Sequence, residues 1–267
     1  MRILEERPDL RERLDSYVLH NIILVTEGGS TAHGIADGTT EDTDWYGVYL
    51  EMPWQVVGLG EARTIVLRDK PEGVKSEPGD LDLTLHPLRK FTRLAIGGNP
   101  TILGQLFAPT IDCGPLGDEI RDEFPKHIIS RRAGDAFLGY LTQQKMRLIE
   151  GRSMRVNRPE LVERYGYDTK YAAHALRLGI QGVELLTHGT IMYPMQSPYL
   201  ELVRSVRHGE LTKGAAIEHI EDYEARLEKL RRSLDVAVRD EPDWEWANYF
   251  LQHVLLSEWT SEAGGYK

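Results

Sequence analysis

The stretch GGSTAHGIADGTTEDTDWYGVYL, residues 28–50, decides the fold, because it joins two apolar segments through a loop rich in chemically active side chains. The apolar run NIILVT (21–26) precedes it, and its last seven residues, DWYGVYL, form a second apolar and aromatic run. Short runs of this kind, bounded by Gly, Asp and Thr, predict two strands joined by a turn. We therefore expect a strand–turn–strand unit with Gly-Gly-Ser at one end of the loop and Asp-x-Asp at the other.

The Asp-x-Asp pair consists of Asp42 and Asp44, two positions apart at the head of the second strand. Side chains two apart on a strand point to the same face, so both carboxylates can converge on one metal ion or on a metal pair. Mg²⁺ favours a site with few carboxylates in which substrate phosphates complete the coordination. Two such ions are the usual clamp for phosphoryl or nucleotidyl transfer.

The Gly-Gly-Ser segment, residues 28–30, follows the first strand directly. Glycines let a backbone approach a phosphate closely, and a helix that starts near Ser30 would turn its free N–H groups toward an anion. The Ser30 hydroxyl adds one more donor. Either motif alone is weak, and an ordinary loop has the same pattern; the two together on a strand–turn–strand unit predict a phosphate and metal site.

A third carboxylate comes from DLDLTLH (80–86), which alternates with period two. Its leucines face one way, and Asp80 and Asp82 share the other face with Thr84 and His86. A neighbouring strand in the same sheet could bring either aspartate beside the Asp-x-Asp pair. A strand with one wet face would have the same pattern, so the choice between the two aspartates stays open.

The rest of the chain predicts an α+β fold. We expect an amphipathic helix over residues 5–19, a strand at 63–67 and a helix that starts at Pro87. Strand signals fade after about residue 115, and helical periodicity then dominates at 130–150, 168–187, 198–208, 212–238 and 243–260. The simplest division is a mixed domain over residues 1–110 and an all-α domain over 111–267.

Charge and composition exclude several classes of protein. The net charge is −10, so a long-duplex DNA partner is not expected, because the phosphate backbone favours Lys and Arg. Residues 126–158 carry eight Lys or Arg against two acids, whereas residues 218–245 carry ten acids against five bases. The basic tract predicts a local anionic ligand, such as an NTP or RNA, although a solvated helix face would look similar.

No apolar run approaches eighteen residues, so no membrane span is expected. The charged N-terminus has no apolar core of the kind that a secretory signal needs. Cys113 is the single cysteine, so an intramolecular disulfide is impossible. We therefore expect a cytoplasmic protein without a membrane partner.

The order Gly-Ser, Asp-x-Asp and a later single Asp on a strand resembles the DNA polymerase beta-like nucleotidyltransferase superfamily. The segment DTDWYGVYLEMP (42–53) is similar to the predicted nucleotidyltransferases of the RlaP or YcgL group. Three further stretches resemble that group: LHPLRKFTRLAIGGNPTILGQLF (85–107), YDTKYAAHALRL (167–178) and GVELLTHGTI (182–191). The resemblance thus touches both expected domains.

The resemblance implies a catalytic nucleotidyltransferase domain over 1–110, with a mixed sheet flanked by helices, and a helical domain over 111–267 that closes over the nucleotide or substrate. The implied reaction moves an NMP from an NTP, such as ATP, to an acceptor hydroxyl, with pyrophosphate release and Mg²⁺ or Mn²⁺ as cofactor. The basic tract and the family's link to RNA repair favour an RNA or tRNA end as the acceptor, with a small hydroxylated molecule or a protein side chain as the alternatives. The implied catalytic and metal-binding residues are Asp42, Asp44 and Asp82, with Asp80 as the rival; the implied nucleotide-binding residues are Gly28, Gly29, Ser30, Lys170, His174 and Arg177.

Two alternatives to an enzyme remain. A nucleotide-binding sensor would keep the phosphate site and transfer nothing, and an RNA-interaction protein would keep only a degenerate fold. The presence of all three acids argues against the sensor. Binding of NTP without pyrophosphate release would favour it.

The helix expected at 168–187 places Lys170, His174, Arg177, Gln181 and Glu184 on one face. The residues alone are typical of a solvated face. The resemblance to a Lys-x-x-x-His-x-x-Arg pattern implies instead that this face closes over a cleft, with Lys170 and Arg177 on phosphates. His33 departs from the family, which more often has an aromatic residue there; it could contact base or phosphate, or act within its own loop.

Overall fold

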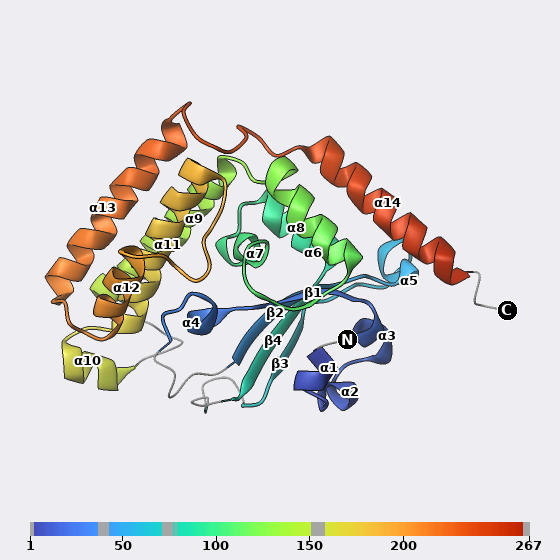
Figure 1. Cartoon of the computed structure of the whole chain (residues 1–267), viewed down its shortest axis with the longest axis horizontal. Helices are drawn as coiled ribbons and strands as arrows, with labels where there is room; N and C mark the ends of the chain where they lie inside the picture. Colours follow the sequence, from blue (N-terminus) through green and yellow to red (C-terminus); the bar gives the residue numbers. More distant parts are fainter. Residues whose placement is uncertain (1–2, 37–42, 71–76, 78, 151–157, 264–267) are drawn as a thin grey trace.

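The computed structural model describes residues 3–36, 43–70, 77, 79–150 and 158–263. Its centre is a five-stranded sheet in the order β3-β4-β2-β1-β5, with helices on both faces (Figure 1). The strands are β1 (Ile22–Glu27), β2 (Thr43–Tyr49), β3 (Ile65–Arg68), β4 (Leu81–Pro87) and β5 (Thr110–Cys113). The pair β2–β4 is parallel and the other three pairs are antiparallel. The mixed sheet and the helices that follow it confirm the predicted α+β class.

The alternation in β4 is confirmed along its whole length, because every second residue is buried. Leu81, Leu83 and Leu85 point into a core beneath the sheet and are fully buried there. The polar residues between them face the other side, where the strand is half-buried. The leucine run therefore fixes which way the intervening Asp82 points.

The face of the sheet with the leucines is covered by the N-terminal residues (Figure 1). The single helix expected over residues 5–19 is wrong: three short helices stand there, α1 (Ile3–Glu6), α2 (Leu10–Arg13) and α3 (Ser16–His20). Pro8 has no N–H to continue the first helix. Asp15 caps the third, because its carboxylate accepts hydrogen bonds from the N–H groups of Tyr17 and Val18.

The opposite face is covered by α6, α7 and α8, and a bundle of α9, α11, α12 and α13 lies beside them over the end of the sheet that carries α4 (Figure 1). Helix α14 lies at the other end, near α5 (Figure 1). The helices after the first three are α4 (Gly29–Ala32), α5 (Pro53–Val56), α6 (Leu88–Ile96), α7 (Pro100–Gln105), α8 (Pro115–His127), α9 (Arg132–Glu150), α10 (Pro159–Tyr165), α11 (Thr169–His188), α12 (Tyr199–Arg207), α13 (Lys213–Arg232) and α14 (Trp244–Ala263).

The five helical segments expected after residue 115 match α9 and α11 to α14, whereas α8 and α10 were not anticipated. The expected domain boundary between residues 110 and 111 falls within β5. Residues from both expected domains therefore contribute to this edge strand of the sheet. One hydrophobic core joins Leu24 and Val48 of the sheet to Phe137 and Leu176 of the bundle. The division into two domains stays a prediction. Within the described ranges, no helix has the length and apolar character needed to span a lipid bilayer.

Candidate active site at the β2–β4 strand ends

The Gly28–Gly29 turn lies directly against Asp44. The N–H of Gly28 donates to the carbonyl of Asp44 at 2.8 Å. A Cβ on Gly29 would lie 1.9 Å from Oδ2 of Asp44, and a Cβ on Gly28 would lie 2.2 Å from the ring of Tyr46. Gly29 also has a φ of +60°, which L side chains rarely adopt. Two glycines are therefore needed for the backbone after β1 to reach the Asp44 carboxylate.

Ser30 contributes through its backbone to the shape of this turn. Its carbonyl accepts hydrogen bonds from the N–H groups of Ile35 at 2.9 Å and Ala36 at 3.2 Å. Together with α4, these bonds fold residues 28–36 back on themselves. The segment expected to hold phosphates is thus a compact loop that starts beside Asp44 and ends near His33.

Asp44 and Asp82 are direct neighbours across the parallel pair β2–β4. Residues paired in this way have Cα atoms about 4.8 Å apart and point to the same face. Both side chains lie on the half-buried side, opposite Trp45 and Leu83. Nε of Arg68, on β3, lies 3.7 Å from Oδ1 of Asp82, with both side chains partly exposed. The sheet therefore brings two of the three expected carboxylates together.

Asp80 takes a different place. Its Oδ2 accepts a hydrogen bond from the N–H of Glu77 at 2.6 Å, and its carbonyl accepts one from Thr43 at 2.7 Å. It precedes β4 and stabilises the turn into that strand. The geometry therefore favours Asp82 over Asp80 as the partner of Asp44.

Asp42, the first residue of the Asp-x-Asp pair, lies outside the described residues. Among the side chains that the structure does describe, no group of three or more His, Cys, Asp or Glu gathers as a metal site would require. The described part of the expected triad is the pair Asp44 and Asp82. That pair suits Mg²⁺ chemically, because carboxylate oxygens are its preferred protein ligands and few are needed. Gly29 keeps the space beside Oδ2 of Asp44 free of a Cβ, so the residues present fit the cation.

Tyr46 is a site residue that was not anticipated, although period two from Asp44 along β2 could have identified it. Burial and the charge of Asp44 raise the pKa of its phenol to about 12, and the charge of Arg177 opposes this shift. The phenol therefore lies within electrostatic reach of both the carboxylates and the bundle. Tyr46 therefore connects the carboxylates on the sheet with Arg177 on α11.

The polar face of α11 packs against the loop after α4 and is not a solvated surface. Gln181 is 2% exposed, and Nη1 of Arg177 donates to Oε1 of Gln181 at 3.0 Å and to Nε2 of His33. Burial, together with the charges of Arg177 and Arg147, lowers the pKa of His174 to about 3. This arrangement brings Arg177 and His174 toward the site from the helical side.

Lys170 stands apart from that buried group. It is exposed on the first turn of α11, where its N–H donates to the capping carboxylate of Asp168 at 3.0 Å. Tyr193, from the segment between α11 and α12, stacks on the ring of His33 with centroids 4.8 Å apart. Only the tertiary fold reveals the place of Tyr193, because no sequence period links it to the loop it contacts.

Part of the basic tract 126–158 is paired with the acidic tract 218–245. Arg131 lies 2.8 Å from Asp240, Arg132 lies 2.8 Å from Glu241, and Lys145 on α9 forms an ion pair with Glu224 on α13. The helices α9 and α13 lie side by side in the bundle (Figure 1). These pairs neutralise part of the charge of each tract. Arg147 forms no ion pair with any described residue, and its charge reaches His174 instead.

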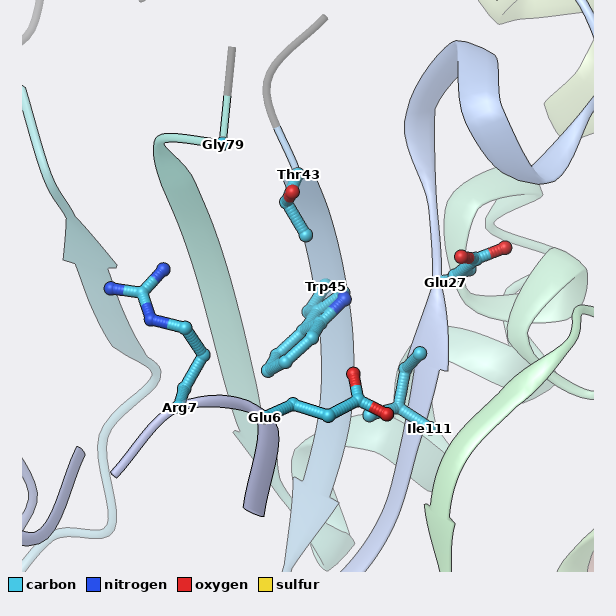
Figure 2. A pocket seen from close by; sticks show the side chains of 7 residues that line it. All are labelled: Glu6, Arg7, Glu27, Thr43, Trp45, Gly79 and Ile111. Atoms are coloured by element: carbon cyan, nitrogen blue, oxygen red, sulfur yellow. The ribbon is translucent and has the colours of Figure 1, made fainter. Parts of the chain in front are cut away.

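A separate hollow of about 320 Å³ lies on the opposite face of the sheet (Figure 2). Thr43 and Trp45 line it from β2, and Glu6 at the end of α1 and the following Arg7 border it (Figure 2). Asp44 stands between Thr43 and Trp45 and therefore points to the other face. This hollow is not the site built by the carboxylates.

Comparison with known proteins gives one family. The family model described as the RNA repair pathway DNA polymerase beta family, RlaP, matches residues 8–252. No curated protein matches the chain. Among solved structures, the chain is similar to a nucleotidyltransferase-like protein from Exiguobacterium sibiricum, with 12% identity, coverage of 86% of this chain and 74% of that chain, and a TM-score of 0.32.

Proposed function

Because the chain belongs to the RNA repair pathway DNA polymerase beta family, we propose that it transfers a nucleoside monophosphate from an NTP to the hydroxyl end of an RNA. The observation that carries this proposal is the direct pairing of Asp44 with Asp82 on adjacent parallel strands, with Gly29 packed on the Asp44 carboxylate. The family's link to RNA repair supports an RNA acceptor. The ion pairs in the bundle reduce the basic surface available to an RNA. In the described part of the basic tract, Arg147 is the residue that forms no ion pair.

Asp44 and Asp82, together with Asp42, are the residues that would hold Mg²⁺ or Mn²⁺. Bound there, the cation would polarise the phosphate oxygens and favour deprotonation of the acceptor hydroxyl. The backbone N–H groups of Gly29 and Ser30 would donate to the β- and γ-phosphates, and the guanidinium of Arg177 would neutralise part of their charge.

The reaction needs no covalent enzyme intermediate. The acceptor oxygen forms a bond to the α-phosphorus while the bond from that phosphorus to the bridging oxygen of the β-phosphate breaks. Pyrophosphate leaves with the electron pair, and a carboxylate oxygen of Asp82 takes the hydroxyl proton. Lys170, exposed at the start of α11, would meet the departing pyrophosphate as a point charge.

The test is pyrophosphate release from each of the four NTPs with Mg²⁺ or Mn²⁺, in the presence and absence of RNA. We expect release that requires RNA and that falls by about two orders of magnitude or more in Asp44→Asn and in Asp42→Asn, with the melting temperature unchanged. Unchanged turnover in these variants would refute the assignment of the carboxylates. Binding of NTP without any release would favour the sensor instead.

A further inference from the structure

A buried polar triangle joins the loop after α4 to the face of α11. His33 is 5% exposed, and its Nε2 meets Nη1 of Arg177. Its Nδ1 lies 3.2 Å from Nε2 of Gln181, whose Oε1 lies 3.0 Å from Nη1 of Arg177. Tyr193 stacks on the imidazole and closes the remaining side. The triangle is thus built from both parts of the molecule; His33 and Gln181 are buried in it, whereas Arg177 is partly exposed.

The triangle has fewer acceptors than its geometry requires. Burial and the charges of Arg177 and His174 hold the pKa of His33 well below its usual value, so its imidazole is neutral and has one acceptor nitrogen. Arg177 has only donors, so Nε2 of His33 must accept and Nδ1 must carry the proton.

The side-chain amide of Gln181 cannot accept hydrogen bonds from both His33 and Arg177 in either of its two orientations. With its Nε2 toward Nδ1 of His33, two donors face each other. With the amide rotated so that Oε1 accepts from Nδ1, the Nη1 group of Arg177 loses its second acceptor. The phenol of Tyr193 also hydrogen-bonds the side chain of Gln181. One N–H therefore lacks a partner within the triangle, and a buried donor without an acceptor is costly.

The positive charge of Arg177 also has no carboxylate partner among the described residues. None of the ion pairs formed by the described residues includes it, and burial lowers the pKa of its guanidinium. Its charge acts on Tyr46, whose phenol also feels Asp44 and Asp82. Arg177 and the carboxylates of Asp44 and Asp82 therefore all lie close enough to Tyr46 to act on its phenol. An oxyanion bound beside Arg177 would supply both a counter-charge and a hydrogen-bond acceptor.

We infer that His33 is a positioning residue that holds Nη1 of Arg177 so that the guanidinium presents its other N–H groups to a phosphate oxygen of the NTP. That oxygen supplies the counter-charge that the guanidinium lacks among the described residues. The inference rests on the proposed function, because it takes the anion to be the NTP. His33 itself touches no substrate atom and acts only through Arg177.

The experiment measures binding and turnover of each NTP with Mg²⁺ in full-length variants. We expect His33→Leu to raise the dissociation constant of the preferred NTP about tenfold, with a smaller change in kcat, because the guanidinium loses its anchor. His33→Gln retains an acceptor for Nη1 and should restore affinity to within about twofold of wild type. His127→Leu is the matched control, since His127 also stacks on an aromatic ring, with its centroid 4.2 Å from that of Trp246, but at the α8–α14 contact.

The decisive comparison is the double-mutant cycle with Arg177→Met. If His33 acts through Arg177, adding His33→Leu to Arg177→Met should change NTP affinity less than about twofold. An equal loss in both backgrounds, or a loss that His33→Gln fails to restore, would refute the positioning role. Melting temperatures of all variants separate these effects from misfolding. Wild-type protein that binds no NTP would refute the proposed function itself, whereas NTP binding that is insensitive to His33→Leu would refute only this inference.

Discussion

At the scale of single residues, the site depends on which polar side chain each backbone position can present. Asp80 and Asp82 are equivalent in the alternating sequence, yet only Asp82 pairs with Asp44. Asp80 is already committed to the N–H of Glu77. The physical difference is register, which strand pairing sets and which periodicity alone leaves open.

The rivalry between the two aspartates gives a direct test. Asp82→Asn should lower the rate of pyrophosphate release by about two orders of magnitude or more, because a carboxylate is lost beside Asp44. Asp80→Asn should keep the rate within about threefold, since an amide oxygen still accepts from Glu77. Steady-state rates of the two variants, measured side by side, show which aspartate is the third carboxylate. The reverse order would make Asp80 the third carboxylate.

Gly29 gives a second test at this scale. Gly29→Ala should reduce kcat by about a hundredfold, because the new Cβ would displace the Asp44 carboxylate from its position. The positive φ adds a strain of about 1 kcal/mol to the folded state. Gly166→Ala is the matched control, since Gly166 has a φ of +79° and a Cβ added there would meet no atom within 4 Å. Equal kcat in the two variants would show that close packing on Asp44 is unimportant.

At the scale of elements, Glu51 ties the end of β2 to two helices. Its Oε1 accepts from the N–H of Arg89 in the first turn of α6 at 2.9 Å, and its carbonyl accepts from Nε1 of Trp259 on α14 at 3.0 Å. The side chain is 1% exposed, and Oε2 has no hydrogen-bond partner among the described residues. Burial raises the pKa of this carboxyl above its usual value.

A raised pKa means that the folded protein binds the Glu51 proton more tightly than the unfolded chain does. The stability that this proton contributes is present at low pH and is lost as the pH rises through the folded-state pKa. Glu51→Gln should therefore melt at a higher temperature than wild type at about pH 8, and the difference should shrink toward about pH 4. Thermal unfolding across this range checks it, with exposed Glu61→Gln as control. Parallel profiles for wild type and Glu51→Gln would contradict the expectation.

Helix α11 illustrates how packing overrides a surface pattern. Its polar stripe has the spacing of a solvated face, yet Gln181 is buried and Arg177 contacts a loop 144 positions away in sequence. Polar residues on one stripe can equally well line a contact between two layers when the partner is also polar. The identity of that partner, His33, depends on how the bundle sits on the sheet.

At the scale of the whole molecule, the charge asymmetry of the sequence is resolved within the fold. The basic tract and the acidic tract meet across the bundle and its following loop, so part of the positive charge of the basic tract is paired in the folded protein. Exposed ion pairs of this kind contribute about 0–1 kcal/mol each to stability. Arg147 in the basic tract has no ion-pair partner among the described residues, and its charge acts on His174 near the site.

This arrangement predicts which arginine matters for an anionic substrate. Arg147→Ala should weaken binding of single-stranded RNA or NTP about fivefold and flatten the salt dependence, because an unpaired charge is removed. Arg132→Ala should change affinity less than about twofold, since Glu241 already pairs with Arg132 at 2.8 Å. Binding titrations at two ionic strengths compare them. A larger effect at Arg132 would show that the paired tract opens toward the substrate.

The sequence by itself determined the strands β1, β2, β3 and β4, the main helices of the bundle and the face on which Asp82 lies, because these depend on periodicity and on local turn chemistry. The short edge strand β5 and the break of the N-terminal segment into three helices depend on tertiary pairing and on local caps, and were not anticipated.

Only the tertiary structure decided the register that sets Asp44 beside Asp82, the contact of Arg177 with His33, and the pairing of the two charged tracts. Each of these joins residues far apart along the chain, and no local pattern encodes the distance between them. The cost of ordering such contacts is recovered through burial of the whole core, so the arrangement is a property of the folded molecule as a unit.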